Sequence, residues 1–172
     1  MSVTPSGPLS KPLAAFRDLL SACPEWQTWV SESIEPRPAP DSAAAAGRIY
    51  YFRNARPELP FVVIDWENDW QYALNDNVGQ RITCSIEMVV VALRDHPNDN
   101  AGSAPEDDRM TFANRIGQVM KEAMALMRRE EVTITQIDLT DAPARAVAEV
   151  RREEGDFQQA VFRVALVFPT AD

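Results

Sequence analysis

The chain has very little of the residue on which most catalytic sites depend. Its 172 residues include 1 histidine, His96, which lies in a polar segment beside Pro97. A Ser-His-Asp site would have to use His96, whose neighbours offer no orienting partner. No glycine-rich phosphate-binding pattern and no His-Glu-x-x-His pattern occurs, and the 6 glycines are scattered. We therefore expect a protein that is not an enzyme and that uses no cofactor.

Cysteine is scarce as well. Cys23 precedes Pro24, and Cys84 lies inside an apolar strand pattern. These 2 cysteines and one histidine cannot complete a Cys/His zinc site. We predict that both are small buried hydrophobic residues. A disulfide between them stays open at this level, although a cytosolic setting disfavours it.

Long apolar runs are missing. No run approaches the roughly 18 residues that would span a bilayer. Met1–Pro8 lacks the basic-then-apolar pattern of a signal peptide. We expect synthesis in the cytoplasm and no membrane partner.

Positive charge is in deficit, and the deficit is local. The net charge is -9, and residues 61–110 hold ten acidic and three basic side chains. An acidic surface argues against gripping nucleic-acid phosphates, but it is compatible with lying beside nucleic acid and repelling it.

The strongest pattern in the chain is Arg81–Leu93. Its apolar residues fall at every second position, from Ile82 through Ala92, and Val89, Val91 and Leu93 make the other face apolar near the end. This pattern predicts a long strand that is buried on one face throughout and on both faces in its second half.

The remaining elements follow from periodicity and from turn residues. The sequence predicts helices over 10–22, 24–33 and 110–130, and strands over 48–52, 59–70, 132–139 and 157–168. Residues 145–150 fit either a helix or a strand, and we choose a strand that forms a hairpin with the last run. The order predicts one α+β domain over residues 1–172. Its mainly antiparallel sheet would have about five to six strands, with the long amphipathic helix and an N-terminal helix packed on it.

Three segments are predicted to lie outside this framework. Residues 1–9 are expected to be flexible, and 35–47 and 95–108 to be long loops, because proline and small polar or alanine residues dominate them. In the helix over 110–130, Leu126 belongs to the apolar stripe that we expect to face the core. We expect Met120, Met124 and Met127 to fill gaps in the core. Trp26 and Trp29 are predicted to be packing anchors.

Carboxylates and tryptophans alternate after the strand that begins at Leu59. Asp65, Glu67 and Asp69 would share one strand face. Three such groups could hold a hard divalent cation, but no calcium-loop spacing accompanies them. We favour a solvated or interface-facing acidic edge and predict no metal. Trp66 and Trp70 on the same stretch are candidate interface anchors, with burial in the core equally open.

The order of elements resembles that of the tail terminators of tailed bacteriophages and their similar minor tail and neck proteins. The resemblance runs from Pro12 to Phe168. It includes the opening helix, the strand entered by Leu59-Pro60-Phe61, the long strand ending at Leu93, the amphipathic helix and the closing Phe162–Phe168 run. The two long loops are longer than this fold requires.

The resemblance implies a function by assembly and no catalytic residues. It implies a homo-oligomeric ring, a hexamer by expectation, that caps the tail-tube protein and faces the head connector, in a virion assembled in the host cytoplasm. DNA would pass through without specific binding, which an acidic channel permits. Asp65, Glu67, Asp69, Asp107 and Asp108 are the candidate channel or interface face. Another head–tail completion protein, or a non-viral α+β module that binds a ligand or protein, is the alternative.

Overall fold

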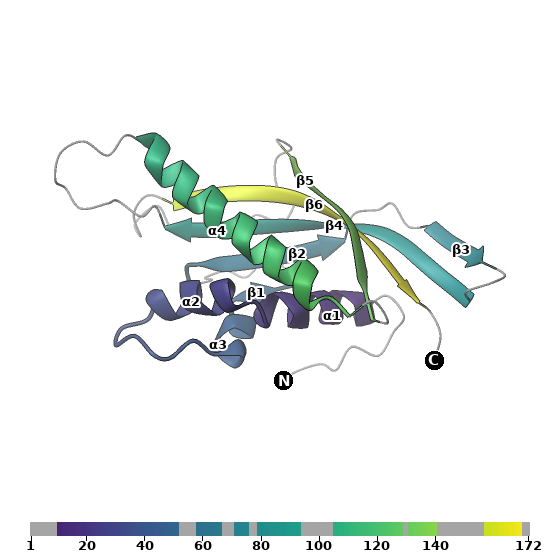
Figure 1. Ribbon diagram of the computed structural model, residues 1–172, viewed down its shortest axis with the longest axis horizontal. Helices are drawn as coiled ribbons and strands as arrows, with labels where there is room; N and C mark the ends of the chain where they lie inside the picture. Colours follow the sequence, from purple (N-terminus) through teal and green to yellow (C-terminus); the bar gives the residue numbers. More distant parts are fainter. Residues whose placement is uncertain are drawn as a thin grey trace.

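The computed structural model describes residues 10–51, 58–66, 71–75, 79–93, 105–128, 131–140 and 157–169. Within these ranges the helices lie on one side of a long, twisted sheet (Figure 1). The elements in chain order are α1 (Ser10–Ser21), α2 (Pro24–Glu32), α3 (Ser42–Gly47), β1 (Ile49–Tyr50), β2 (Phe61–Trp66), β3 (Gln71–Asn75), β4 (Gly79–Leu93), α4 (Pro105–Leu126), β5 (Thr133–Thr140) and β6 (Phe157–Pro169).

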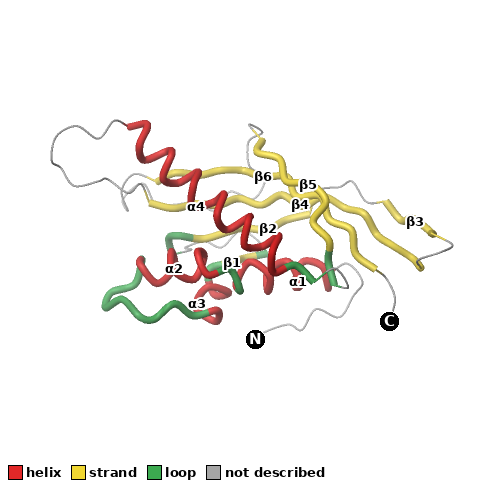
Figure 2. The backbone as a smooth tube through the Cα atoms, in the orientation of Figure 1, coloured by secondary structure: helices red, strands yellow, loops and turns green. Residues whose placement is uncertain are grey.

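The sheet is mixed and mostly antiparallel, which confirms the predicted α+β class. Its strand order is β1-β2-β4-β6-β5, and β3 pairs with the first part of β4. Among these pairings only β1 with β2 is parallel. Figure 2 shows the strands side by side, with α4 crossing them diagonally. The hairpin strand β3 was not predicted as a separate element.

Strand β4 is the centre of the sheet, as its sequence predicts. It pairs with β2, β3 and β6. Its even-numbered residues from Ile82 to Ala92 belong to the main core cluster, together with side chains from α1, α2 and α4. Val89 and Val91 on its other face are also buried, in a second cluster with Phe61, Val63 and Val161. Both faces of the second half of β4 are therefore buried, as expected.

The helices contribute aromatic side chains to the main core. Trp26 and Trp29 are 2% and 7% exposed, and their rings meet edge to face with centroids 5.8 Å apart. Phe112 of α4 makes the same kind of contact with Trp29. Both tryptophans are thus packing anchors, as predicted, and edge-to-face pairs add to the stabilisation from burial. Cys23 and Cys84 are buried free thiols, which confirms their predicted role.

The expectation of one long loop over residues 35–47 was wrong, because residues 42–47 form α3. Asp41 caps this helix by accepting a hydrogen bond from the Ala44 N–H at 2.9 Å. Alanine is the best helix former, so a capped run of four alanines favours a helix over a spacer. Trp26 donates its indole N–H to the Ala45 carbonyl at 3.1 Å, and Arg17 donates to Ala46. Helix α3 is therefore packed against α1 and α2.

The expected loop over residues 95–108 was also too long, because α4 begins at Pro105. Proline suits the first helical position, since its missing N–H has no intrahelical partner there. Asp107 and Asp108 therefore belong to the helix. At the other end α4 stops at Leu126, earlier than the predicted residue 130.

Two apolar residues of α4 are less buried than predicted. Met120 and Met127 pack against the main core, as expected, but Met124 is 47% exposed. Leu126, which the helical stripe assigns to the core, is 45% exposed. The core-facing stripe of α4 is therefore narrower than its sequence suggests, and both flanks carry an uncovered hydrophobic side chain.

Other predictions lie outside the described residues. They include the flexibility of residues 1–9, the strand over 145–150 and the continuation of the second predicted strand over 67–70. In the part of the chain that is described, no helix has the length and apolar character needed to cross a membrane.

Candidate functional surfaces

Asp65 is the residue of the predicted acidic face that the structure places in full. It lies at the end of β2, half-buried, on the sheet face opposite the helices. Its backbone neighbour across the sheet is Glu87 of β4, which is 5% exposed. Because strand residues alternate between faces, the two carboxylates share the same face.

Glu87 belongs to a row of charges that crosses four strands. Its neighbour on β6 is Arg163, whose neighbour on β5 is Asp138. The row therefore reads Asp65, Glu87, Arg163, Asp138, with the cation between the carboxylates. Like charges directly opposite each other are destabilising and unlike charges are favourable, so Arg163 offsets the Asp65–Glu87 proximity. Asp65, Glu87 and Arg163 each have an interaction partner, and Asp138 accepts a hydrogen bond from Gln136 at 2.8 Å.

The other residues of the predicted face are not brought together by described contacts. Glu67, Asp69 and Trp70 lie outside the described residues. Trp66 is the last residue of β2, where its backbone pairs with Ile86, but its side chain is outside the described part. Asp107 and Asp108 are placed at the beginning of α4 by their backbone alone.

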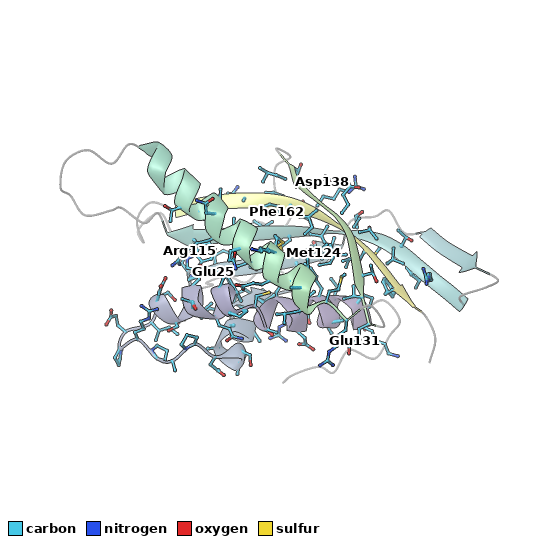
Figure 3. All side chains as sticks on the ribbon, viewed as in Figure 1. Glu25, Arg115, Met124, Glu131, Asp138 and Phe162 are labelled. Carbon is cyan, nitrogen blue, oxygen red and sulfur yellow. The ribbon has the colours of Figure 1, made fainter. Side chains whose placement is uncertain are left out.

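A second set of charges joins α2 to α4, and sequence reasoning missed it. Arg115 of α4 forms ion pairs with Glu32 and, at 3.5 Å, with Glu25, both on α2. Its guanidinium also lies 5.3 Å from the centre of the Trp29 ring. Figure 3 shows Glu25 and Arg115 facing each other across the two helices. The sequence separation between these residues leaves no local signal for the pairing.

Glu122 completes this set by capping α2. Its Oε2 accepts a hydrogen bond from the Glu25 backbone N–H at 2.8 Å. Cys23, at the N-cap position of α2, provides no side-chain cap. Glu122 of α4 therefore supplies the acceptor that the first turn of α2 lacks.

The pKa of Glu25 is shifted in opposite directions by its surroundings. Desolvation raises the pKa of Glu25, Arg115 lowers it, and Glu122 and Glu32 raise it, with a net rise above the usual value. Burial, with a smaller effect of Glu122, raises the pKa of Cys23 to about 12. The Cys23 thiol donates to the carbonyls of Leu19 and Val119. A thiol with so high a pKa is a poor nucleophile and a poor metal ligand.

The described surface contains a hollow between α1 and the chain segment that follows α4. Its volume is about 350 Å³. Leu19 and Val132 provide a buried apolar floor, and Leu126 is uncovered at its side. Charged groups form the rim. The full lining is Ala15, Asp18, Leu19, Ala22, Leu126, Arg128, Glu131 and Val132.

A second space, of about 10 Å³, lies in the core between Trp29, Val90 and Ile116 and is lined by apolar residues. It is a packing defect about the size of one water. Within the described ranges no three His, Cys, Asp or Glu side chains lie close enough to hold a metal ion.

Comparison of the chain with models of known protein families gives no match, and comparison with curated proteins gives none either. The functional argument therefore depends on the residues themselves and on the resemblance in element order.

Proposed function

We propose that this chain is a structural virion protein of a tailed bacteriophage, a ring-forming tail terminator that caps the tail tube and joins it to the head connector. The supporting observation is the exposure of Leu139. This leucine is 70% exposed on β5, which is the last strand in the order of the described sheet. Met124 and Leu126 of α4 are also uncovered, and burial of such side chains in an assembly would remove their apolar surface from water.

The polar groups support the same proposal. In the described part of the chain, Arg115 of α4 joins its helix to α2 by ion pairs with Glu25 and Glu32. Such pairs hold a scaffold in shape, and their positions do not converge on a pocket as catalytic groups would. The acidic segment 61–110 is then available to line a channel that repels DNA.

The test is the mass of the purified protein by light scattering, alone and with a tail-tube protein. The proposal expects a ring of defined size, or an arrest of tube growth by substoichiometric amounts of the chain. A protein that neither oligomerises nor affects tubes contradicts it. A ring that binds the head connector but has no effect on tubes would favour the neck or completion protein instead.

The hollow beside α1 favours a second candidate, a small α+β module that binds a ligand. Its volume of about 350 Å³ is in the range of ligand pockets, roughly 300–1,000 Å³. A ligand screen by thermal shift tests this candidate, with Ala22→Arg as the control variant because Ala22 lines the hollow. A ligand that raises Tm for the wild type and not for this variant would support it.

A further inference from the structure

The uncovered hydrophobic side chains occupy two different sides of the molecule. Within the described ranges the large exposed hydrophobic residues are Met124, Leu126 and Leu139. Successive residues of an α-helix turn by about 100°, so Met124 and Leu126 are separated by about 200° around α4. Leu126 faces the hollow, together with α1. Met124 therefore lies on the opposite flank of α4, away from α1.

Leu139 lies away from the hollow as well. It is near the end of β5, whereas the hollow includes Glu131, just before the beginning of this strand. Leu139 pairs with Phe162 of β6 and shares its sheet face, and Phe162 is half-buried against the main core. Figure 3 shows Asp138 near one end of β5 and Glu131 at the other. Leu139 and Phe162 lie on the sheet face that the helices cover, and α4, which carries Met124, lies over the same face. We call Met124, Leu139 and Phe162 the apolar surface.

We propose that a second copy of this chain inserts Leu139 and Met124 of its apolar surface into the hollow between α1 and the end of α4. This inference rests on the proposed function, since it names the contact by which copies of the chain assemble. The hollow offers an apolar floor, Leu19 and Val132, of the kind that an exposed leucine requires. Association then removes the uncovered side chains of both surfaces from water.

Charge on the two surfaces is complementary. Lys121 lies three residues before Met124, so it is on the neighbouring part of the helix surface and exposed. With the described residues it forms no ion pair. The rim of the hollow carries two carboxylates, Asp18 and Glu131, against one guanidinium, Arg128, which lies 3.9 Å from Glu131. Asp18 is exposed and is the natural partner for a lysine of the incoming copy.

The contact joins two surfaces that lie on different sides of the chain, so one two-fold axis cannot satisfy both at once and the contact is heterologous. Each copy uses its apolar surface on one neighbour and its hollow on another. Repetition of such a contact gives a ring when the rotation between copies closes, and a filament when it does not. A two-fold symmetric dimer in which the apolar surfaces of both copies meet would, in contrast, leave the hollow open.

The experiment compares two variants by sedimentation and light scattering over concentrations up to millimolar. Leu139→Glu places a charge on the apolar surface, and Ala22→Arg fills the hollow, where Ala22 is exposed. Ala125→Glu and Ala43→Arg are the matched controls, because both alanines are exposed and lie outside the two surfaces. Circular dichroism checks that all four variants are folded.

Each of the first two variants should weaken association by at least about thirtyfold, as the loss of a central interface residue does, and the controls should not. Mixing Leu139→Glu with Ala22→Arg should restore dimers and nothing larger, because one intact surface remains on each variant. A wild-type chain that is monomeric at every concentration overturns the inference. Oligomers that both variants leave unchanged overturn it too, as does binding of a small ligand in the hollow without loss of oligomers.

The same variants test the contact between copies and the proposed function separately. If each variant by itself still forms rings that cap tail tubes, the proposed function stands and the proposed contact is wrong. If the wild-type chain forms oligomers that either variant abolishes, but these oligomers have no effect on tubes or connectors, the proposed contact stands and the proposed function is wrong.

Discussion

The surroundings of Glu25 act on the pKa of its carboxyl in opposite directions. Burial, Glu122 and Glu32 favour its protonated form, and Arg115 favours the charged one. Because the net effect raises the pKa in the folded chain, the folded state binds this proton more tightly than the unfolded state does. This contribution to stability is present below the ordinary pKa of glutamate and is lost as pH rises through the folded pKa.

We therefore predict that Glu25→Gln becomes more favourable relative to the wild type as pH rises. The difference in Tm between variant and wild type should increase from acidic to neutral pH, because glutamine carries no charge to desolvate. Thermal unfolding followed across this pH range measures it. Glu35→Gln, at an exposed position, controls for the loss of one surface charge. A difference that shrinks with rising pH would contradict the prediction.

The two cysteines should be inert in the folded protein. Cys23 is 0% exposed with a pKa of about 12, and Cys84 is 1% exposed. We expect a thiol reagent at neutral pH to modify neither until the chain unfolds, because the thiolate is the reactive form and the reagent cannot reach it. Absorbance with a chromogenic disulfide, with and without denaturant, measures this. Rapid reaction of either thiol in the native protein would contradict the prediction, and reaction of Cys23 would show that the region between α1 and α2 opens.

At the scale of elements, α3 is a short helix held by few groups. It has 6 residues, so it cannot be stable by itself. Its cap at Asp41 and the hydrogen bonds from Trp26 and Arg17 to its carbonyls keep it in place. These contacts hold the segment between α2 and β1 against α1 and α2.

Asp41→Ala should lower the free energy of unfolding by about 1 kcal/mol, since it removes the acceptor for the Ala44 N–H. Urea denaturation followed by tryptophan fluorescence measures the change. Asp41→Asn is the matched control, because asparagine caps helices about as well as aspartate. Equal losses for the two variants would show that the charge, and not the cap, stabilises this segment.

Helix α4 packs on the sheet and also contacts α2. Its inner stripe packs on the sheet, one flank holds α2 through Arg115 and Glu122, and the other flank carries the exposed Met124. The helix is therefore both the cover of the core and the boundary between the hollow and the apolar surface. Leu139 of β5 and Ala22 beside α1 lie on opposite sides of this boundary, so a variant at either position changes one surface and leaves the other intact.

At the scale of the whole molecule, folding and assembly should depend on different leucine-sized residues. Ile86 is 0% exposed at the centre of β4, and Leu139 is 70% exposed. Ile86→Ala should lower the free energy of unfolding by about 2–5 kcal/mol, because it leaves a cavity in the core. Leu139→Ala should change it by no more than about 0.5 kcal/mol.

For association between copies, in contrast, Leu139→Ala should have a larger effect than Ile86→Ala. Leu139→Ala should weaken the contact between copies while its urea midpoint stays that of the wild type. Parallel measurement of urea midpoints and of mass against concentration gives both quantities. A large loss of stability in Leu139→Ala would show that this leucine supports the fold and would remove it as an assembly residue.

Local pattern was sufficient for the longest elements of this chain. The alternation in Arg81–Leu93 identified the central strand and its two buried faces, and the 3.6-residue spacing identified α4, because both periods follow from backbone geometry. The class, α+β with a mainly antiparallel sheet, followed from their order. The alanine run of α3 was misread, since its cap and its partners in α1 and α2 decide between helix and spacer.

Only the tertiary structure decided which residues meet. The register of the strands β2, β4, β6 and β5 aligns four charged residues in one row: Asp65, Glu87, Arg163 and Asp138. The sequence shows which residues share a face of a single strand, but not which residues of different strands are neighbours. Glu122 caps a helix 97 positions away, and the hollow joins α1 to the end of α4. Such contacts depend on how helices cross a twisted sheet, and no short-range period records that crossing. The sequence by itself thus determined the central strand, its buried faces and the long helix, and the packing of the elements decided the surfaces on which function is proposed.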